Sequence, residues 1–153
     1  MNDWVSGGLR GDLFMNIRQV ELQDREFWMG IDTHVDPEGF DNRVSAKTGY
    51  VLWRENLPVG LMWHNVLWDN LPFLNLLFVA PEHRGKGYGA GAMAQWEHEM
   101  KKRGFRMVLV STQVDESAQA FYRKLGYVDC GGLVFHDTPF KQPMELFMRK
   151  TIQ

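Results

Sequence analysis

The chain has 153 residues, the size of one ordinary domain that can bury a hydrophobic core. With 44% hydrophobic and 24% charged residues it has a globular composition, and its net charge of −2 gives no global basic field that would attract nucleic acid. No apolar run reaches the length of a transmembrane helix. The single cysteine, Cys130, excludes an internal disulfide and fits a reducing cytosol, so we predict a cytoplasmic protein.

The first residues of the chain carry no targeting pattern. Residues 1–14 contain glycines but no continuous apolar core, so they do not match a secretory signal. We interpret them as an N-terminal extension, with Met15 as a candidate natural start, and we assign residues 15–153 to a single domain.

The first half of this domain alternates between short strands and helical segments. In chain order we predict a strand over 17–20, a helix from Leu22 to about His34, an irregular helical or loop region over 36–47, strands over 50–54 and 59–66 joined by a turn at 55–58, and a strand over 73–79 after a turn at Asp69–Asn70.

The most informative segment follows the last of these strands. Residues 75–91 read Asn-Leu-Leu-Phe-Val-Ala-Pro-Glu-His-Arg-Gly-Lys-Gly-Tyr-Gly-Ala-Gly, which predicts a strand, a short polar turn and glycines that open a helix. Glycines let the backbone approach a ligand closely, and the first turn of a helix offers unpaired N–H groups and a positive dipole end. Arg84 and Lys86 add two cations, so the segment suits a phosphate group.

A helix and a buried strand follow this turn. Residues 88–103 form an amphipathic pattern in which Met93, Trp96 and Met100 share one face, and basic residues fill the last turn before Gly104. Met107–Val110 is apolar throughout, which is typical of a strand covered on both faces.

A second helix and two strands complete the domain. Asp115 can cap a helix whose apolar face contains Ala118, Phe121, Tyr122 and Leu125 and which stops at Gly126. Strands are predicted near 127–134 and 145–150, and the polar loop between them carries His136, Asp137, Pro139 and Pro143.

Other glycine-rich motifs compete with this interpretation of the turn. A Walker A loop requires Ser or Thr after Gly-Lys, whereas Lys86 is followed by Gly87, so that motif is excluded. Gly87, Gly89 and Ala92 satisfy G-x-G-x-x-A, but in a dinucleotide-binding loop the glycines follow the strand at once, and here residues 80–83 intervene. A flexible turn without a ligand stays open as a third alternative.

Two segments together resemble the GNAT superfamily of N-acetyltransferases. Arg84, Gly87 and Gly89 match its acyl-CoA pyrophosphate loop Arg/Gln-x-x-Gly-x-Gly/Ala, and residues 115–127 are similar to its stretch Asn-x-x-Ala-x-x-Phe-Tyr-x-Lys-x-Gly-Phe. The resemblance covers roughly residues 15–151. It implies an α/β fold with a mixed, mostly antiparallel central sheet of about seven strands, about four flanking helices and splayed central strands.

The resemblance also implies a co-substrate, acetyl-CoA, and no metal. In the family, pantetheine lies along the strand before the loop, and a backbone N–H of that strand can stabilise the developing oxyanion. Backbone groups of the strand and the loop are therefore expected to bind acetyl-CoA, the residues being Leu77, Phe78, Val79, Arg84, Gly85, Lys86, Gly87, Tyr88, Gly89 and Ala90.

Tyr122 is the residue that the resemblance assigns to proton transfer. The family places a tyrosine at this position to protonate the departing CoA thiolate, and the alternative for Tyr122 is a purely packed aromatic ring. Asp115 departs from the family's asparagine, because a carboxylate lacks the amide donor and brings a negative charge near an anionic cofactor. We therefore expect Asp115 to act only as a helix cap.

The general base is not indicated directly. Several family members have Glu or His on the strand before the loop, where this chain offers Phe73 and Asn75; neither is a base, although Asn75 can orient a water. His64, on the neighbouring strand, is our candidate base, with a structural role as the alternative. Further candidates near the acceptor are Glu21, Asp32 and His34, and His83 is expected to serve the phosphate loop or to face solvent.

The acceptor leaves only compositional hints. Asp32, Asp36, Glu38 and Asp41 either attract a cationic amine or form a solvated acidic loop. We predict transfer of acetyl to a primary amine by direct attack in a ternary complex, with a small-molecule acceptor because no partner module is visible. The alternatives are a protein amine and a non-catalytic acyl-CoA-binding module. We expect neither nucleic acid nor membrane as partner, and a homodimer stays open.

Overall fold

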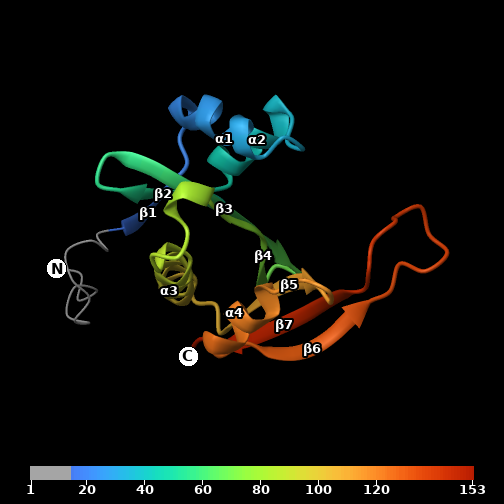
Figure 1. Ribbon diagram of the computed structural model, residues 1–153. Helices are drawn as coiled ribbons and strands as arrows, with labels where there is room; N and C mark the ends of the chain where they lie inside the picture. Colours follow the sequence, from blue (N-terminus) through green and yellow to red (C-terminus); the bar gives the residue numbers. More distant parts are fainter. Residues whose placement is uncertain (1–14) are drawn as a thin grey trace.

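The computed structural model describes residues 15–153, and a single seven-stranded sheet organises them (Figure 1). The strand order is β1-β2-β3-β4-β5-β7-β6. All neighbouring strands pair antiparallel except β4 and β5, which are parallel, so the predicted mixed and mostly antiparallel sheet is confirmed. The strands are β1 (Met15–Gln19), β2 (Gly49–Arg54), β3 (Leu57–Leu67), β4 (Leu71–Val79), β5 (Met107–Gln113), β6 (Val128–Leu133) and β7 (Glu145–Thr151).

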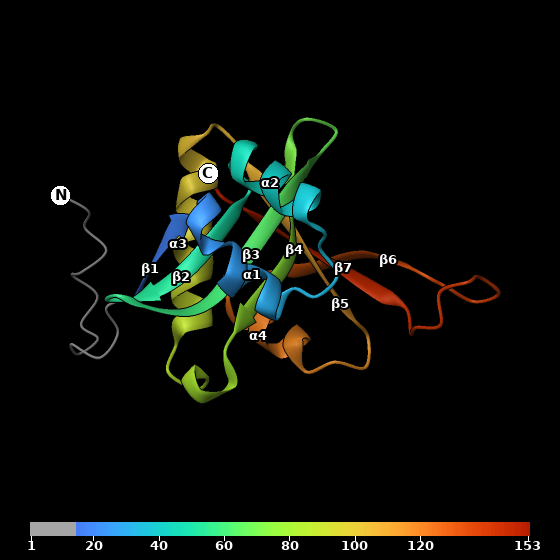
Figure 2. The same cartoon turned by 90° about the horizontal axis from the view of Figure 1, so that it is seen from above.

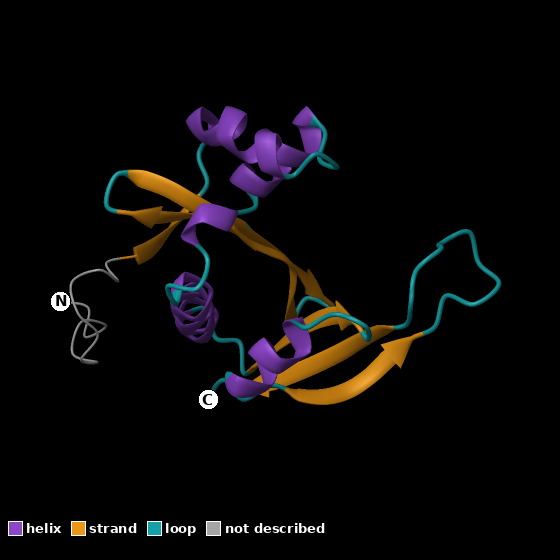
Figure 3. Ribbon diagram, viewed as in Figure 1, coloured by secondary structure: helices purple, strands orange, loops and turns teal. Residues whose placement is uncertain are grey.

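Four α-helices cover the two faces of this sheet (Figures 1 and 3). The first pair is α1 (Arg25–Ile31) and α2 (Pro37–Ser45), and the second is α3 (Tyr88–Lys102) and α4 (Ala118–Lys124). The view from above shows α1 and α2 over the first four strands and α3 on the opposite side (Figure 2). No helix within residues 15–153 has the length and apolar character needed to cross a membrane.

Two apolar clusters hold the layers together, one on each face. The larger contains Met93, Trp96 and Met100 of α3 together with β-strand residues, and these three side chains are fully buried as the helical periodicity predicts. The smaller cluster is built around Trp28 and Phe40, which contact edge to face beneath α1 and α2. Burial of aromatic side chains on both faces therefore fixes the sheet between the two helix layers.

The sheet opens in its centre. β4 and β5 pair only through Phe73–Leu109 and Leu74–Val110, after which the two strands diverge. The rest of β4 pairs with β3 alone and has a free edge toward the opening. The predicted splay of the central strands is thus present, and we call the gap between residues 75–79 and 111–113 the splay.

Three local predictions differ from the structure. The first helix divides into a 3-10 turn (Leu22–Asp24) and α1, which ends at Ile31 because Asp32 leaves helical geometry. The β2–β3 turn contains only residues 55–56, and Pro58 lies inside β3 opposite an irregularity of the pairing. Asp115 does not cap α4: it lies in the turn before the helix, and Ser117 occupies the cap position.

Candidate active site

A tight turn joins the end of β4 to α3. After a 3-10 turn (Pro81–His83) the backbone takes left-handed φ angles at Gly85 (75°) and at Gly87 (83°), which is the N-cap of α3. Residues with a Cβ rarely adopt these angles, so the glycines are required by the turn itself. The first amide groups of this 15-residue helix have no intrahelical acceptor and lie beside the turn, which makes its N-terminus suited to an anion.

A cavity of about 600 Å³ lies against this turn and unites three separate parts of the chain. Its walls come from the end of β4, from the turn with the first residues of α3, and from α4. It contains nine of the ten residues predicted to bind acetyl-CoA, Lys86 being the exception, together with Tyr122. The lining residues are Leu77, Phe78, Val79, His83, Arg84, Gly85, Gly87, Tyr88, Gly89, Ala90, Ala118, Phe121 and Tyr122.

The free edge of β4 presents alternate backbone groups to this cavity. The Phe78 carbonyl points toward β3, since an ideal Cβ on Gly60 would lie only 2.1 Å from its oxygen. Because successive residues of a strand point their backbone groups in opposite directions, Leu77 and Val79 present theirs to the splay. Phe78 also lines the cavity, but its carbonyl faces β3 and its side chain packs against the smaller apolar cluster, so the backbone contact suggested by the sequence is better supplied by its two neighbours.

Arg84 closes the loop onto the strand. Its Nε donates to the Val79 carbonyl at 2.8 Å, and its guanidinium lies 5.3 Å from the centre of the Phe78 ring. The side chain is otherwise exposed, and so is that of Lys86. Arg84 therefore has a structural role as well as a charge that suits a phosphate.

Tyr122 lies on the cavity wall formed by α4. Its ring packs edge to face against Phe121 and Tyr127, and only 9% of the residue is exposed. Burial, with a smaller contribution from the nearby Glu116 carboxylate, raises the pKa of Tyr122 to about 12. The hydroxyl is therefore a protonated donor throughout the physiological pH range.

Two further lining residues on α4 were not assigned from the sequence. Ala118 and Phe121 lie four residues and one residue before Tyr122, in the same turn of α4. This helical spacing is the sequence feature from which their place in the cavity wall could have been predicted.

His64 lies in the core rather than on a reactive surface. It is 1% exposed, its Nδ1 accepts a hydrogen bond from Trp96 Nε1 at 3.1 Å, and its ring stacks on Tyr50 at 6.0 Å between centroids. Burial, followed by the charge of Arg103, lowers the pKa of His64 to about 4. A neutral imidazole enclosed on the α3 side of the sheet has no route to an acceptor, and this placement favours the structural alternative.

This placement predicts a pH-dependent stability. Below pH 6.5 the unfolded chain protonates His64 while the folded protein does not until about pH 4, so stability is lost as the pH falls through this window. The pKa difference corresponds to about 3 kcal/mol at the acid end. We expect His64→Gln, which keeps an acceptor for Trp96, to flatten the decline in urea midpoint between about pH 6.5 and 4.

The matched control is His136→Gln, because the His136 side chain is 83% exposed. We expect this variant to reproduce the wild-type dependence on pH. An unchanged slope in His64→Gln would contradict the buried, neutral assignment.

The other acidic candidates have structural partners. Asp32 is buried and forms an ion pair with Arg43, whose guanidinium lies 3.9 Å from the centre of the Trp63 ring. Asp36 caps α2 by accepting from the Gly39 amide at 2.7 Å. These contacts support the view that the acidic loop has a local structural role.

Three more acidic candidates and two histidines complete this set, and of these Glu38 is exposed in the first turn of α2. Asp41 pairs with Arg25, and Glu21 takes part in a capping box with Asp24. His34 is exposed, whereas His83 lines the cavity with a buried Nδ1 that has no partner within residues 15–153.

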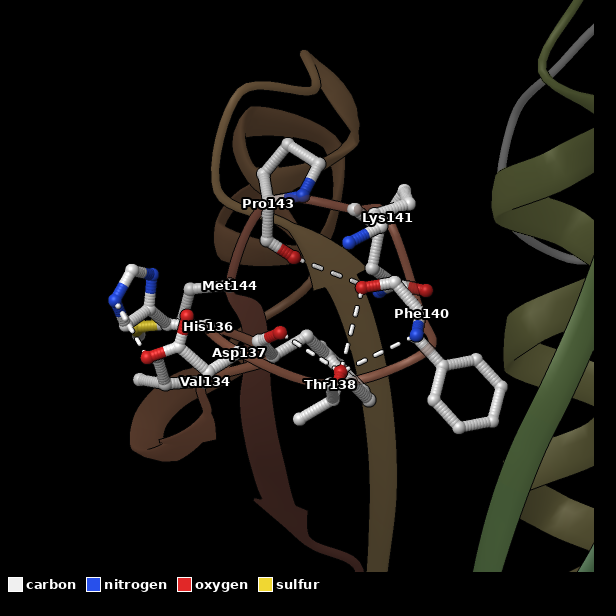
Figure 4. A pocket seen from close by; sticks show the side chains of 10 residues that line it. Val134, His136, Asp137, Thr138, Phe140, Lys141, Pro143 and Met144 are labelled. Carbon is white, nitrogen blue, oxygen red and sulfur yellow. Dashed lines mark hydrogen bonds and ion pairs between the residues drawn. The ribbon is translucent and has the colours of Figure 1, made fainter.

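A second hollow, of about 540 Å³, lies inside the long loop between β6 and β7 (Figure 4). All ten residues that line it lie within the segment 134–144, and Thr138 holds the loop together by donating to the Phe135 carbonyl at 2.7 Å and accepting from the Phe140 amide at 3.2 Å. This hollow contains no residue of the glycine turn between β4 and α3. We therefore place the candidate active site in the cavity beside α3 and α4.

Comparisons with known proteins agree with this geometry. The profile of the Acetyltransferase (GNAT) family matches residues 13–127, which is most of the chain. The protein therefore belongs to the GNAT acetyltransferase family, whose members are acetyl-CoA-dependent N-acetyltransferases. No curated protein sequence matches the chain.

Several solved structures share its fold. Ribosomal-protein-alanine N-acetyltransferase from Brucella melitensis is 22% identical, with a TM-score of 0.75 over 89% of this chain and 99% of that chain. A probable acetyltransferase from Staphylococcus epidermidis is 10% identical, with a TM-score of 0.78 over 91% and 99%. Salmonella typhimurium yncA, solved with its cofactor acetyl-CoA, is 17% identical, with a TM-score of 0.73 over 91% and 94%.

Proposed function

We propose that the protein transfers the acetyl group of acetyl-CoA to a primary amine by direct attack within a ternary complex, and that the acceptor is a small molecule. The observation that carries this proposal is the cavity in which the phosphate-binding turn, the free edge of β4 and Tyr122 meet. A turn that served only packing would not need a protonated hydroxyl from another helix in the same cavity, and Tyr122 supplies one.

Each part of the cavity has a role in this proposal. The N-terminal amides of α3 and the left-handed glycines hold the pyrophosphate, with Arg84 and Lys86 as nearby cations. Backbone groups of Leu77 and Val79 align pantetheine along the free edge of β4 and orient the thioester carbonyl. Acetyl-CoA supplies that carbonyl and the thiolate leaving group.

Tyr122 has the role of general acid in this proposal, because the departing sulfur needs a proton. As the amine nitrogen bonds to the carbonyl carbon and the C–S bond breaks, the Tyr122 hydroxyl gives its proton to the departing sulfur. The amine loses a proton to water, and Tyr122 regains one from solvent. No residue forms a covalent intermediate, and among residues 15–153 no cluster of three or more His, Cys, Asp or Glu side chains is arranged to hold a metal ion.

A protein amine is the second candidate acceptor. Structures similar to this chain include the Brucella melitensis enzyme. Another is Arabidopsis thaliana Naa50, which is 13% identical to this chain and was solved in complex with the bisubstrate analogue CoA-Ac-MVNAL. Structures with small-molecule ligands also occur, such as Neisseria gonorrhoeae N-acetylglutamate synthase in complex with coenzyme A and N-acetyl-glutamate, 12% identical. Similarity at this level supports the fold and leaves the choice of acceptor to experiment.

The decisive experiment is release of free CoA from acetyl-CoA with a panel of acceptors. The panel contains small primary amines, amino acids and short peptides with free α-amino groups. We expect release that depends on at least one small amine and exceeds the rate without acceptor. Acetyl-CoA binding without release for any member of the panel would support the non-catalytic alternative instead.

A further inference from the structure

β4 carries one extra residue at the point where it leaves β5. The consecutive β3 residues Trp63 and His64 pair with Leu76 and Leu74, so Asn75 has no partner of its own and forms a β-bulge. Pairing with β5 ends at Leu74, which makes Asn75 the first residue of β4 within the splay. Bulges re-aim side chains and are common beside active sites.

A second asparagine holds the Asn75 side chain in place. Asn75 Nδ2 donates to the side-chain oxygen of Asn65 and, at 3.1 Å, to the Phe73 carbonyl. Asn65 and Phe73 are paired across β3 and β4, so all three residues share one face of the sheet. These bonds use both amide hydrogens of Asn75 and leave its exposed side-chain oxygen free of any hydrogen bond to residues 15–153.

The surroundings of this oxygen are mostly neutral. The Phe73 ring lies 5.9 Å from the Phe147 ring, and Ser111 pairs with Phe147 from the far side of the splay. On the same face, Glu145 and Arg149 flank Phe147 at alternate positions of β7, and Asp32 of the α1–α2 layer is paired with Arg43. Two other titratable groups, His64 and Tyr122, belong to the α3 side of the sheet.

We propose that Asn75 receives the acceptor's amino group. Its side-chain oxygen accepts a hydrogen bond from an N–H of the amine, which directs the nitrogen lone pair toward the splay. Asn65 positions the Asn75 side chain for this contact. This inference rests on the proposed function and names the residue that orients the nucleophile. An amide oxygen accepts a hydrogen bond but does not take the proton. The proton released during attack therefore passes to water, while Tyr122 protonates the leaving sulfur from the other face.

The same geometry points to a substrate class. Without proton transfer to Asn75, the amine has to arrive as the free base. At neutral pH an α-amino group, with a pKa near 8, has a free-base fraction roughly a few hundred times that of an alkylamine with a pKa near 10.4. Acceptors of low basicity, such as α-amino groups and aromatic amines, are therefore favoured over lysine-like amines.

The test compares two substitutions of similar size at Asn75. We expect Asn75→Leu to lower kcat about tenfold, the effect of losing one hydrogen bond, with the KM for acetyl-CoA unchanged. Asn75→Asp introduces a carboxylate that can take the proton, and Asn65 can turn its amide to donate to it. We expect this variant to raise the kcat/KM of an alkylamine relative to that of an α-amine and to extend activity to lower pH.

Separate variants test the positioning role of Asn65 and provide a control for the added carboxylate of Asn75→Asp. Asn65→Ala is expected to lower kcat, and Asn65→Asp, which still accepts the Asn75 N–H bond, is expected to recover it. Asn16→Asp makes the same chemical change at an exposed residue of the edge strand β1, three strands away from β4, and is expected to leave amine preference unchanged. The thermal shift with acetyl-CoA is measured for every variant to confirm that the cofactor site is folded.

The outcomes separate this inference from the proposed function. If the wild type is active, but Asn75→Asp keeps its amine preference and Asn75→Leu keeps its kcat, the role of Asn75 is overturned and the proposed function stands. A wild type that binds acetyl-CoA and releases no CoA with any amine overturns the proposed function and this inference together.

Discussion

Gly87→Glu is expected to abolish the rise in melting temperature that acetyl-CoA gives to the wild-type protein. Gly87 is the N-cap of α3 with a φ of 83°, directly beside the amides proposed to hold pyrophosphate. A glutamate there places a carboxylate where the phosphates would bind and repels them. A ligand at a hundred times its Kd stabilises a protein by about 2.7 kcal/mol, and this stabilisation is what the variant loses.

The change also strains the backbone, so it needs a control with the same strain. Gly104, just beyond the other end of α3, has a φ of 94° and open space where a Cβ would lie. Gly104→Glu therefore carries a similar cost of about 1–2 kcal/mol through its left-handed backbone. We expect Gly104→Glu to lower the melting temperature of the free protein and to keep the full shift with acetyl-CoA. A full shift in Gly87→Glu would refute the loop as the pyrophosphate site.

The fold was predictable because its strongest signals are local. The 3.6-residue spacing of Met93, Trp96 and Met100 requires a buried helix face, and the glycines at 85 and 87 require a turn, whatever surrounds them. The two segments that resemble the family contribute most of the cavity lining. Prediction from sequence therefore succeeded where periodicity and backbone conformation decide the structure.

Features set by strand register were not predictable. The direction of the Phe78 carbonyl depends on how β4 pairs with Gly60, and the bulge at Asn75 depends on pairing with two residues of β3. A one-residue change of register reverses which face a side chain occupies. The same reason explains His64, whose strand position was identified correctly but whose burial under α3 is a property of the tertiary structure.

Helix caps show a similar limit. Asp115 is a favourable cap residue by type, but the chain makes a further turn there, in which the Glu116 amide donates to the Gln113 carbonyl at 3.0 Å. Glu116 also accepts a hydrogen bond from the buried Thr112 hydroxyl at 2.9 Å. These contacts hold the turn and delay the helix to Ala118, so the preference of one residue type gives way to tertiary contacts.

Tyr122→Phe is expected to lower kcat by about 10²–10⁴-fold, the usual contribution of general acid catalysis, while leaving acetyl-CoA affinity nearly unchanged. Phenylalanine keeps the ring that packs against Phe121 and Tyr127 and removes only the hydroxyl. The measurement is kcat and the acetyl-CoA KM with a competent acceptor under conditions in which chemistry limits the rate. Turnover at the wild-type level would return Tyr122 to a packing role.

The pH dependence adds a second test of the same residue. Because the pKa of Tyr122 is raised to about 12, its hydroxyl stays protonated from about pH 6 to pH 10, and its titration does not shape the rate in that range. The wild-type and Tyr122→Phe curves are therefore expected to run parallel, offset by the lost catalytic factor. An alkaline decline seen only in the wild type would show that the phenol ionises below pH 10 and contradict the buried, protonated donor.

The neighbouring Tyr127 supplies the control for loss of a phenol in this aromatic cluster. Tyr127 is 2% exposed, its hydroxyl donates to Glu97 at 2.9 Å, and it does not belong to the residues that line the cavity. Tyr127→Phe removes that hydrogen bond, so we expect it to cost about 1 kcal/mol of stability or somewhat more and to leave kcat close to wild type. Equal losses of kcat in the two variants would mean that packing of the cluster, rather than the Tyr122 proton, governs turnover.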